Sequence, residues 1–325
     1  MAVTRLLPIE ADTYQRSALH GEDRIWTETN CYVDLWIEAL HSLGIDPASG
    51  LAFTLSADFE GDQWQFVKYP TEDLRALYGL EVSEMNPWRG LEHHVEEQLA
   101  LGRWLTAEVD SWYLPDTAGV SYGIEHVKTS IVANMIDRDA RRLGYFHGAG
   151  YYELEGDDFD GIFWRVGVVP GALPPYVELV RMERFDLVDD DTLTARAQAT
   201  VDDHLGRRPS TNPVQRMAKR FDQDIDWLKC EGMAAFHAYA FATLRQCGAT
   251  AELAASLCAW LSARGHGTAI AGSEFSALAS GCKSVQFKLA RLAAGRDVDV
   301  VGMIESLADH WDVAMAALSD ESGRV

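Results

Sequence analysis

Cys31 is the residue in this sequence that is best placed for nucleophilic chemistry. It opens residues 31–43, whose apolar side chains recur with a helical period, with Thr29 or Asn30 as the N-cap and Gly44 as the end. A thiol attacks as the thiolate, and the unpaired N–H groups in the first turn of a helix favour that anion. The same groups can stabilise the oxyanion that forms when a thiolate attacks a carbonyl. A small buried residue is the alternative reading of such a cysteine.

A nucleophilic thiol needs a base, and His126 is the leading candidate. It begins residues 126–136, whose alternation of side chains predicts a β-strand. A histidine at a strand end can project into a cleft at the sheet edge while the strand fixes its orientation. The imidazole would take the thiol proton and return it to a leaving group. A histidine at the edge of the core, without a catalytic role, is the alternative.

The imidazole of such a pair also needs a polar group that orients it. Asp110 fits best, because it is an acid inside the strand-like run 107–113. His147 lies on the strand predicted to pair with that of His126, and it is a second possible orienter. Three further acids remain open as alternatives: Asp116, Asp137 and Glu153.

The other cysteines favour packing over chemistry. None of the five forms a C-x-x-C pair, and no group of cysteines and histidines has the spacing of a zinc site, so we expect no metal. The remaining four lie in the alanine-rich last third of the chain, where cysteine commonly serves as a small buried residue: Cys230, Cys247, Cys258 and Cys282.

The elements that must position these residues follow an α+β pattern in the first half of the chain. The periodicity predicts helices at 31–43, 71–78 and 91–101, and strands at 51–55, 64–69, 104–113, 126–136, 143–153, 163–169 and 176–182. The last part predicts only helices, near 214–246, 250–263, 272–294 and 298–318. We therefore expect an α+β domain at 1–185, a connection at 186–213, and a helical bundle or cap at 214–320.

Composition narrows the classes of function. The 325 residues carry 28 Lys and Arg against 50 Asp and Glu, a formal charge of −22, which argues against nucleic acids and anionic membranes as partners. No apolar run approaches the ~20 residues that a membrane helix needs. The first ten residues do not have the pattern of a secretory signal, so we expect a cytoplasmic location and reduced thiols.

The chain resembles a bacterial family known as domain of unknown function 1839 (DUF1839). The strings that carry the resemblance extend over roughly residues 20–320: ETNCYVDLWIE at 28–38, DFEGDQ at 58–63, EVD at 108–110, YLPDT at 113–117, EH and KT at 125–129, LGYFH at 143–147, and AGYYELEG at 149–156. The order of elements is also similar to that of the papain-like cysteine fold, in which the cysteine opens an N-terminal helix and an antiparallel sheet carries the histidine.

The resemblance implies a function. The family is similar in architecture to butirosin-type acyltransferases, which move an acyl group from a carrier-protein thioester to an amine. Its genes tend to accompany ligases related to seryl-tRNA synthetases that load amino acids onto carrier proteins. The expected activity is therefore a cysteine-dependent acyl or aminoacyl transfer, with the substrate on the phosphopantetheine of a carrier protein and no other cofactor.

The resemblance also shows where this sequence departs from papain-like enzymes. Ile25 stands where those enzymes carry the oxyanion-hole glutamine, so Asn30, Thr27 or backbone N–H groups would have to replace it. An acidic carrier protein would need a basic patch, for which the sequence offers Arg141 with Arg142, Arg207 with Arg208, and Arg216 with Lys219 and Arg220. Two other functions remain open: a cysteine hydrolase of thioesters or amides, and a non-catalytic protein that binds a carrier protein.

Overall fold

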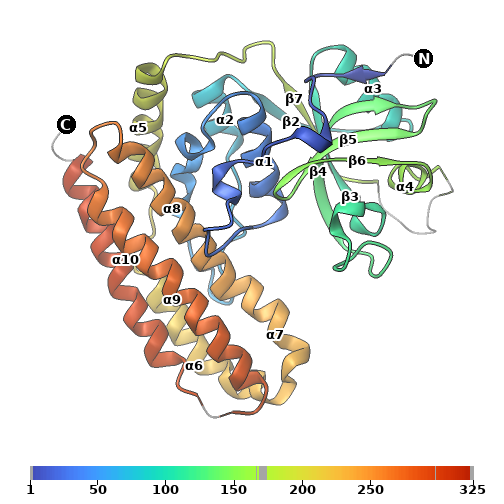
Figure 1. Cartoon of the computed structure of the whole chain (residues 1–325). Helices are drawn as coiled ribbons and strands as arrows, with labels where there is room; N and C mark the ends of the chain where they lie inside the picture. The colour runs from blue at the N-terminus through green and yellow to red at the C-terminus, as the bar shows by residue number, and fades with distance from the viewer. Residues whose placement is uncertain (1–2, 166, 168–173, 297, 323–325) are drawn as a thin grey trace. The chain divides into compact units, whose positions relative to one another are not determined.

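The computed structural model describes residues 3–165, 167, 174–296 and 298–322 (Figure 1). The chain forms two compact units. The first comprises Met1–His20, Cys31–Pro47 and Pro70–Val188, and the second comprises Gly21–Asn30, Ala48–Tyr69 and Asp189–Val325. The chain thus passes between the units several times. Residues 186–213, which we expected to be a connection, contain the helix α5 (Asp190–Gly206).

The first unit is built on an antiparallel sheet with the strand order β2-β7-β3-β4-β5-β6, and β1 pairs with β4. The strands are β1 (Thr4–Arg5), β2 (Glu81–Met85), β3 (Trp104–Asp110), β4 (Lys128–Asp137), β5 (Arg142–His147), β6 (Gly150–Glu155) and β7 (Val177–Arg181). Strands β4, β5 and β6 follow one another in the chain and pair as neighbours through short turns, while β7 returns to lie between β2 and β3. The expected strand at 143–153 is therefore two strands, and β2 was not predicted.

Helix α1 (Cys31–Ser42) is the most deeply buried helix of this unit. Its apolar side chains, such as Val33, Leu35 and Trp36, have essentially no exposed surface. It packs on β4, β5 and β6. The unit also contains α2 (Thr71–Tyr78), α3 (Leu91–Ala100) along β3 and β4, and α4 (Asp157–Ile162). Gly79 ends α2 in a left-handed conformation, as its position after the last apolar residue predicted.

The strand register identifies the face of the sheet on which α1 lies. Glu178 pairs with Thr106, Thr106 with Val132, and Val132 with Phe146. Residues paired in this way share a face, and neighbours along a strand point to opposite faces. Tyr32 of α1 bonds to Glu178, so this row lies on the α1 side of the sheet.

The second unit is helical after a long 3-10 segment, Pro47–Ser56. Its helices are α5, α6 (Pro213–Glu231), α7 (Met233–Ala240), α8 (Gln246–Ser262), α9 (Ala269–Ala293) and α10 (Val301–Ser322), with a π-helical turn at Phe241–Arg245. Helices α8, α9 and α10 pack side by side (Figure 1). The predicted α+β class, with an antiparallel sheet and a helical C-terminal region, is confirmed.

Three of the predicted strands do not form among the described residues. Residues 51–55 belong to the 3-10 segment, and residues 64–69 make only an isolated bridge between Trp64 and Phe59. Of the strand expected at 163–169, residues 163–165 form a turn, and residues 166, 168 and 169 lie outside the described residues. Over the described ranges, no helix combines the length and apolar character needed to cross a membrane.

Candidate functional site

Cys31 is the first residue of α1, as predicted, and its free thiol is partly exposed. The next residue fixes the start of the helix: the hydroxyl of Tyr32 donates to Oε2 of Glu178 over 2.8 Å. Because Cys31 lies in the first turn, it is beside backbone N–H groups that have no partner within the helix.

Glu178 is a buried carboxylate that collects three hydroxyl donors. Besides Tyr32, it accepts from Thr106 at 2.9 Å and from Tyr176 at 3.1 Å. Burial, followed by the charge of Glu178, raises the pKa of Tyr32 well above its ordinary value and that of Tyr176 to about 12. Both phenols therefore stay protonated and keep donating at neutral pH. The start of α1 is thus bonded to the middle of β7 and β3.

His126 and Asp110 form a hydrogen-bonded pair, as the sequence pattern predicted. Nδ1 of His126 lies 2.5 Å from Oδ2 of Asp110. Asp110 is the last residue of β3, and its Oδ1 accepts from the backbone N–H of Trp112 at 3.0 Å. The indole of Trp112 stacks on the imidazole, with centroids 4.5 Å apart and planes 13° from parallel. Asp110 and Trp112 therefore hold the ring in one orientation.

The same pair is open to solvent. The side chain of His126 is 64% exposed and that of Asp110 is 31% exposed. Nδ1 is engaged with the carboxylate, and Nε2 has no partner among the described residues, so Nε2 is free to accept a proton. His126 precedes β4 by two residues, so it stands at the strand end, in the loop.

The register places Asp110 on the α1 face of the sheet. Asp110 pairs with Lys128 and is four residues beyond Thr106, so its side chain points to the same face as Thr106 and Glu178. His126, which bonds to Asp110, is held at the edge of that face. Cys31 and His126 make no direct hydrogen bond in the described structure. The pair and the start of α1 therefore belong to one face without being in contact.

His147 belongs to a separate cluster. Its Nδ1 lies 2.6 Å from Oδ2 of Asp116, and its Nε2 lies 2.8 Å from Oγ1 of Thr129. The hydroxyl of Tyr145 donates to the other oxygen of Asp116 at 2.5 Å. His147 follows Phe146, which is on the α1 face, so it points to the opposite face of the sheet. The structure therefore does not bring His147 to His126 or Cys31.

The remaining predicted groups have other partners. The buried amide of Asn30, in the second unit, donates to the carbonyl of Val67 at 3.0 Å. Oδ1 of Asp137 accepts two backbone N–H groups of the turn between β4 and β5. Glu153 pairs with Arg142. No group of three or more His, Cys, Asp or Glu side chains within the described ranges is arranged to hold a metal ion.

Sequence reasoning missed a buried charged cluster around α1. Nδ1 of His20 lies 2.5 Å from Oε1 of Glu38, and its Nε2 lies 3.5 Å from Oδ1 of Asp34. The hydroxyl of Tyr14 donates to Glu38 at 2.6 Å, and the backbone N–H of Ser17 donates to the same carboxylate. The signal in the sequence is the pair of acids at 34 and 38, four residues apart inside an otherwise apolar helix. It does not reveal that His20 would be the partner.

The predicted basic patches are largely neutralised by carboxylates. Arg141 pairs with Asp160, Arg142 with Glu153, Arg207 with Asp203, Arg216 with Asp58, and Arg220 with Asp224. Arg208 bonds to the carbonyl of Leu205. Five of the seven basic side chains in the predicted patches therefore pair with a carboxylate of their own unit.

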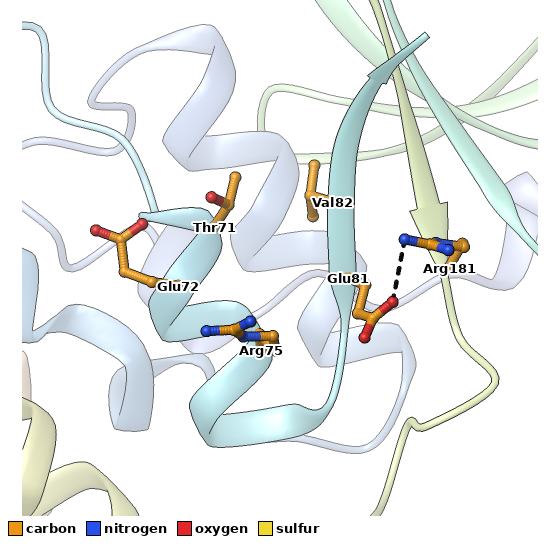
Figure 2. Close-up of a pocket in the computed structure, with 6 residues that line it drawn as sticks. All are labelled: Thr71, Glu72, Arg75, Glu81, Val82 and Arg181. Carbon is orange, nitrogen blue, oxygen red and sulfur yellow. Dashed lines mark ion pairs between the residues drawn. The ribbon is translucent and has the colours of Figure 1, made fainter.

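A shallow groove of about 350 Å³ lies between α2, β2 and β7 (Figure 2). It is lined by Thr71, Glu72, Arg75, Glu81, Val82 and Arg181. Arg181 pairs with Glu81 at 3.2 Å, as the dashed line in Figure 2 shows. No sequence pattern pointed to this groove, because its arginines come from separate elements.

Fold and site together define a class: an α+β protein with a free cysteine at the start of its most buried helix, a solvent-facing His–Asp pair at the sheet, and an all-helical second unit. Comparison with family models is more specific. The model of the DUF1839 N-terminal domain matches residues 15–182, and that of the DUF1839 C-terminal domain matches residues 190–320. The chain therefore belongs to the DUF1839 family, as its sequence strings predicted. A comparison with curated proteins finds no match.

Proposed function

We propose that this protein is a cysteine-dependent acyl or aminoacyl transferase that takes its acyl group from a carrier-protein thioester through an acyl-Cys31 intermediate. The observation that carries the proposal is the His126–Asp110 pair, which stands at the edge of the sheet face that also anchors the start of α1. A cysteine opening a helix and a histidine entering a sheet strand are the arrangement that suggests a papain-like reaction.

The geometry supports a division of roles. Asp110 accepts the Nδ1 proton of His126, which leaves Nε2 to remove the proton of the Cys31 thiol. The thiolate attacks the thioester carbonyl, and the oxyanion faces the N–H groups of the first turn of α1. The C–S bond to phosphopantetheine then breaks, and the departing thiolate receives the proton from His126. One thioester replaces another, so this step is nearly isoenergetic.

The second step returns the enzyme to its starting state. An acceptor amine attacks the acyl-Cys31 carbonyl and loses a proton to His126, and the C–S bond to Cys31 breaks as an amide forms. The proton on His126 passes back to the cysteine sulfur. The mechanism requires Nε2 of His126 to meet the thiol once substrate is bound, since catalytic hydrogen bonds commonly tighten only in the complex.

The proposed partners follow from this chemistry. The acyl donor is an acyl or aminoacyl carrier protein, and a ligase related to seryl-tRNA synthetases would load the amino acid. The protein itself needs no further cofactor in this scheme.

Intact mass spectrometry tests the proposal. The wild-type protein, mixed with aminoacylated carrier protein, should gain the mass of one acyl group, and Cys31→Ala should gain none. Cys230→Ala is the matched control, because Cys230 is the other cysteine that is not buried, and it should acylate normally. His126→Ala should acylate at least about a hundredfold more slowly. If the wild type never carries the acyl mass while the carrier stays loaded, the covalent mechanism is wrong.

The same samples separate the other functions. Adding an amine acceptor should give an amide product, whereas rapid conversion to free acid with or without amine would identify a hydrolase. Carrier-protein binding that is unchanged in Cys31→Ala, without any turnover, would identify a binding protein.

A further inference from the structure

The groove between α2, β2 and β7 differs in charge from the rest of the molecule. A smaller hollow of about 170 Å³, lined by Glu81, Arg181, Glu183 and Arg184, adjoins it and shares two of its residues. Together the two hollows are lined by three arginines and three glutamates, so their lining is neutral overall, while the chain as a whole carries a formal charge of −22.

The carboxylates beside the groove only partly neutralise these arginines. Arg181 and Arg184 share the single carboxylate of Glu81, at 3.2 and 3.4 Å. Arg75, on α2, contacts no carboxylate among the described residues, and Figure 2 draws no ion pair to it. Since a guanidinium has five N–H donors, all three arginines keep donors that no protein group uses.

The start of α2 borders the groove. Thr71 and Glu72 occupy its first turn and line the groove. Pro70 precedes them at the N-cap position and provides no side-chain cap. The backbone N–H groups of Asp73 and Leu74 bond to the carbonyl of Pro70. The positive end of the helix dipole is directed toward the same space.

We propose that this groove binds a small ligand through an oxyanion, either a phosphate or a carboxylate, held by Arg75 and Arg181. The planar fork of a guanidinium matches both anions, and Glu81 holds Arg181 in place without using all of its donors. The exposed carboxylate of Glu72 limits the site to one anionic group and suits a ligand that also carries a cation or hydroxyl.

The groove is separate from the His126–Asp110 pair. Arg181 ends β7 beside Trp104, at the beginning of β3, whereas Asp110 ends β3. Six residues of strand at ~3.4 Å each place the two ends about 20 Å apart. The proposed site does not depend on acyl transfer, and its failure would leave the proposed function untouched.

The oxyanion has two possible sources, a free phosphorylated or carboxylated metabolite or the phosphate of a phosphopantetheine arm. Calorimetric titration of the full chain with inorganic phosphate, succinate, 4′-phosphopantetheine and pantetheine separates them. Phosphate or succinate should bind, with an affinity that falls as salt increases. Preference for phosphopantetheine over both pantetheine and phosphate would assign the arm, and equal binding of phosphate and phosphopantetheine would assign a free metabolite.

Three variants locate the site. Arg75→Gln and Arg181→Gln should each weaken anion binding at least about tenfold, the effect of losing a charged hydrogen bond. Arg291→Gln is the matched control, because it removes the same charge from an exposed arginine at the end of α9 and should bind like the wild type. Circular dichroism checks that each variant is folded. Absence of binding to every anion, or equal affinity in all three variants, would overturn the proposal.

Discussion

The buried cluster of His20, Asp34 and Glu38 predicts that the protein loses stability as the pH rises from neutral to about 9. Burial lowers the pKa of His20, but the hydrogen bonds and charges of Asp34 and Glu38 outweigh this effect and raise the pKa from 6.5 to about 9. The imidazolium therefore persists in the folded protein at neutral pH, where an exposed histidine is mostly neutral.

The sign and the size of the effect follow from linkage. Between pH 6.5 and 9 the folded state holds a proton that the unfolded state has released, so the free energy of unfolding falls as pH rises. The contribution is fully present below pH 6.5 and is lost as the pH passes 9. The difference between the two pKa values corresponds to about 3 kcal/mol.

Urea unfolding at pH 6.5, 8 and 9.5 measures this contribution. We expect wild type to lose about 3 kcal/mol over that range, beyond the slope of His20→Gln. At pH 6.5 the variant itself should be less stable by about 3–5 kcal/mol, because Asp34 and Glu38 then lie buried without a cation. The gap should close toward pH 9.5, where the wild type has lost the same charge.

His310→Gln is the matched control for this experiment. His310 also pairs with an acid, Glu274 at 2.6 Å, but both side chains are partly exposed. Because this pair is partly exposed, its removal should destabilise the protein less than the loss of His20 at pH 6.5. Parallel pH profiles for wild type and His20→Gln would refute the assignment of a buried imidazolium.

Three further predictions follow from contacts in the two units. Trp112→Ala should lower the rate of Cys31 acylation several-fold and remove the upfield ring-current shift of the His126 ring protons. Trp112→Phe should retain both the rate and the shift. Equal behaviour of the two variants would argue against a role for the stacked indole. Gly79→Ala should destabilise the protein by at least about 1 kcal/mol in urea unfolding, because φ is +71° and a Cβ would lie 2.0 Å from the carbonyl oxygen of Arg184; an unchanged midpoint would contradict this. Iodoacetamide on the native protein should label Cys31 and Cys230, and it should spare the buried Cys247, Cys258 and Cys282. If peptide mapping shows early labelling of the three buried cysteines, α8 and α9 open readily.

The sequence predicted best those elements that carry their own start and stop signals. Helix α2 begins and ends at the predicted residues because its apolar period runs directly into Gly79. The strand predicted at 51–55 was wrong, because a short apolar stretch has the same sequence pattern in a buried strand and in a buried helical turn. The strand β2 (Glu81–Met85) was missed because it is a polar edge strand, whose partner β7 is distant in sequence.

Glycines that serve packing also misled the prediction. The predicted helices at 214–246 and 250–263 left Gly248 between them, yet it lies inside α8, where an added Cβ would come within 2.6 Å of the Trp26 ring. A glycine needed for a close approach has the same sequence signature as a glycine needed to stop a helix. Only the position of the neighbouring element distinguishes them, and a single sequence does not contain that information.

For the candidate site too, some features could be predicted from the sequence and others could not. Asp110 could be chosen because an acid inside a strand pattern is unusual, and the structure pairs it with His126. His147 was a second possible orienter, because its strand was predicted to pair with that of His126. Its exclusion from that pair rests on which face it points to, and the face depends on the register between β4 and β5. Side chains predicted from pattern become a site only once the register is known.

Buried acidic side chains hold helix α1 at its first turn and along its length. Glu178 anchors its first turn, and Asp34 and Glu38 bind His20 along its length. Removing one partner of a buried ion pair is costly, but replacing the whole pair by apolar residues of similar size is often neutral or stabilising, so its presence alone is weak evidence for stability. In the proposed mechanism α1 must present Cys31 toward His126, and the position of the helix then matters because a shift of about 1 Å at a reacting group can cost a hundredfold in rate. Glu178→Gln should therefore raise the activation free energy of Cys31 acylation by more than it lowers the free energy of unfolding.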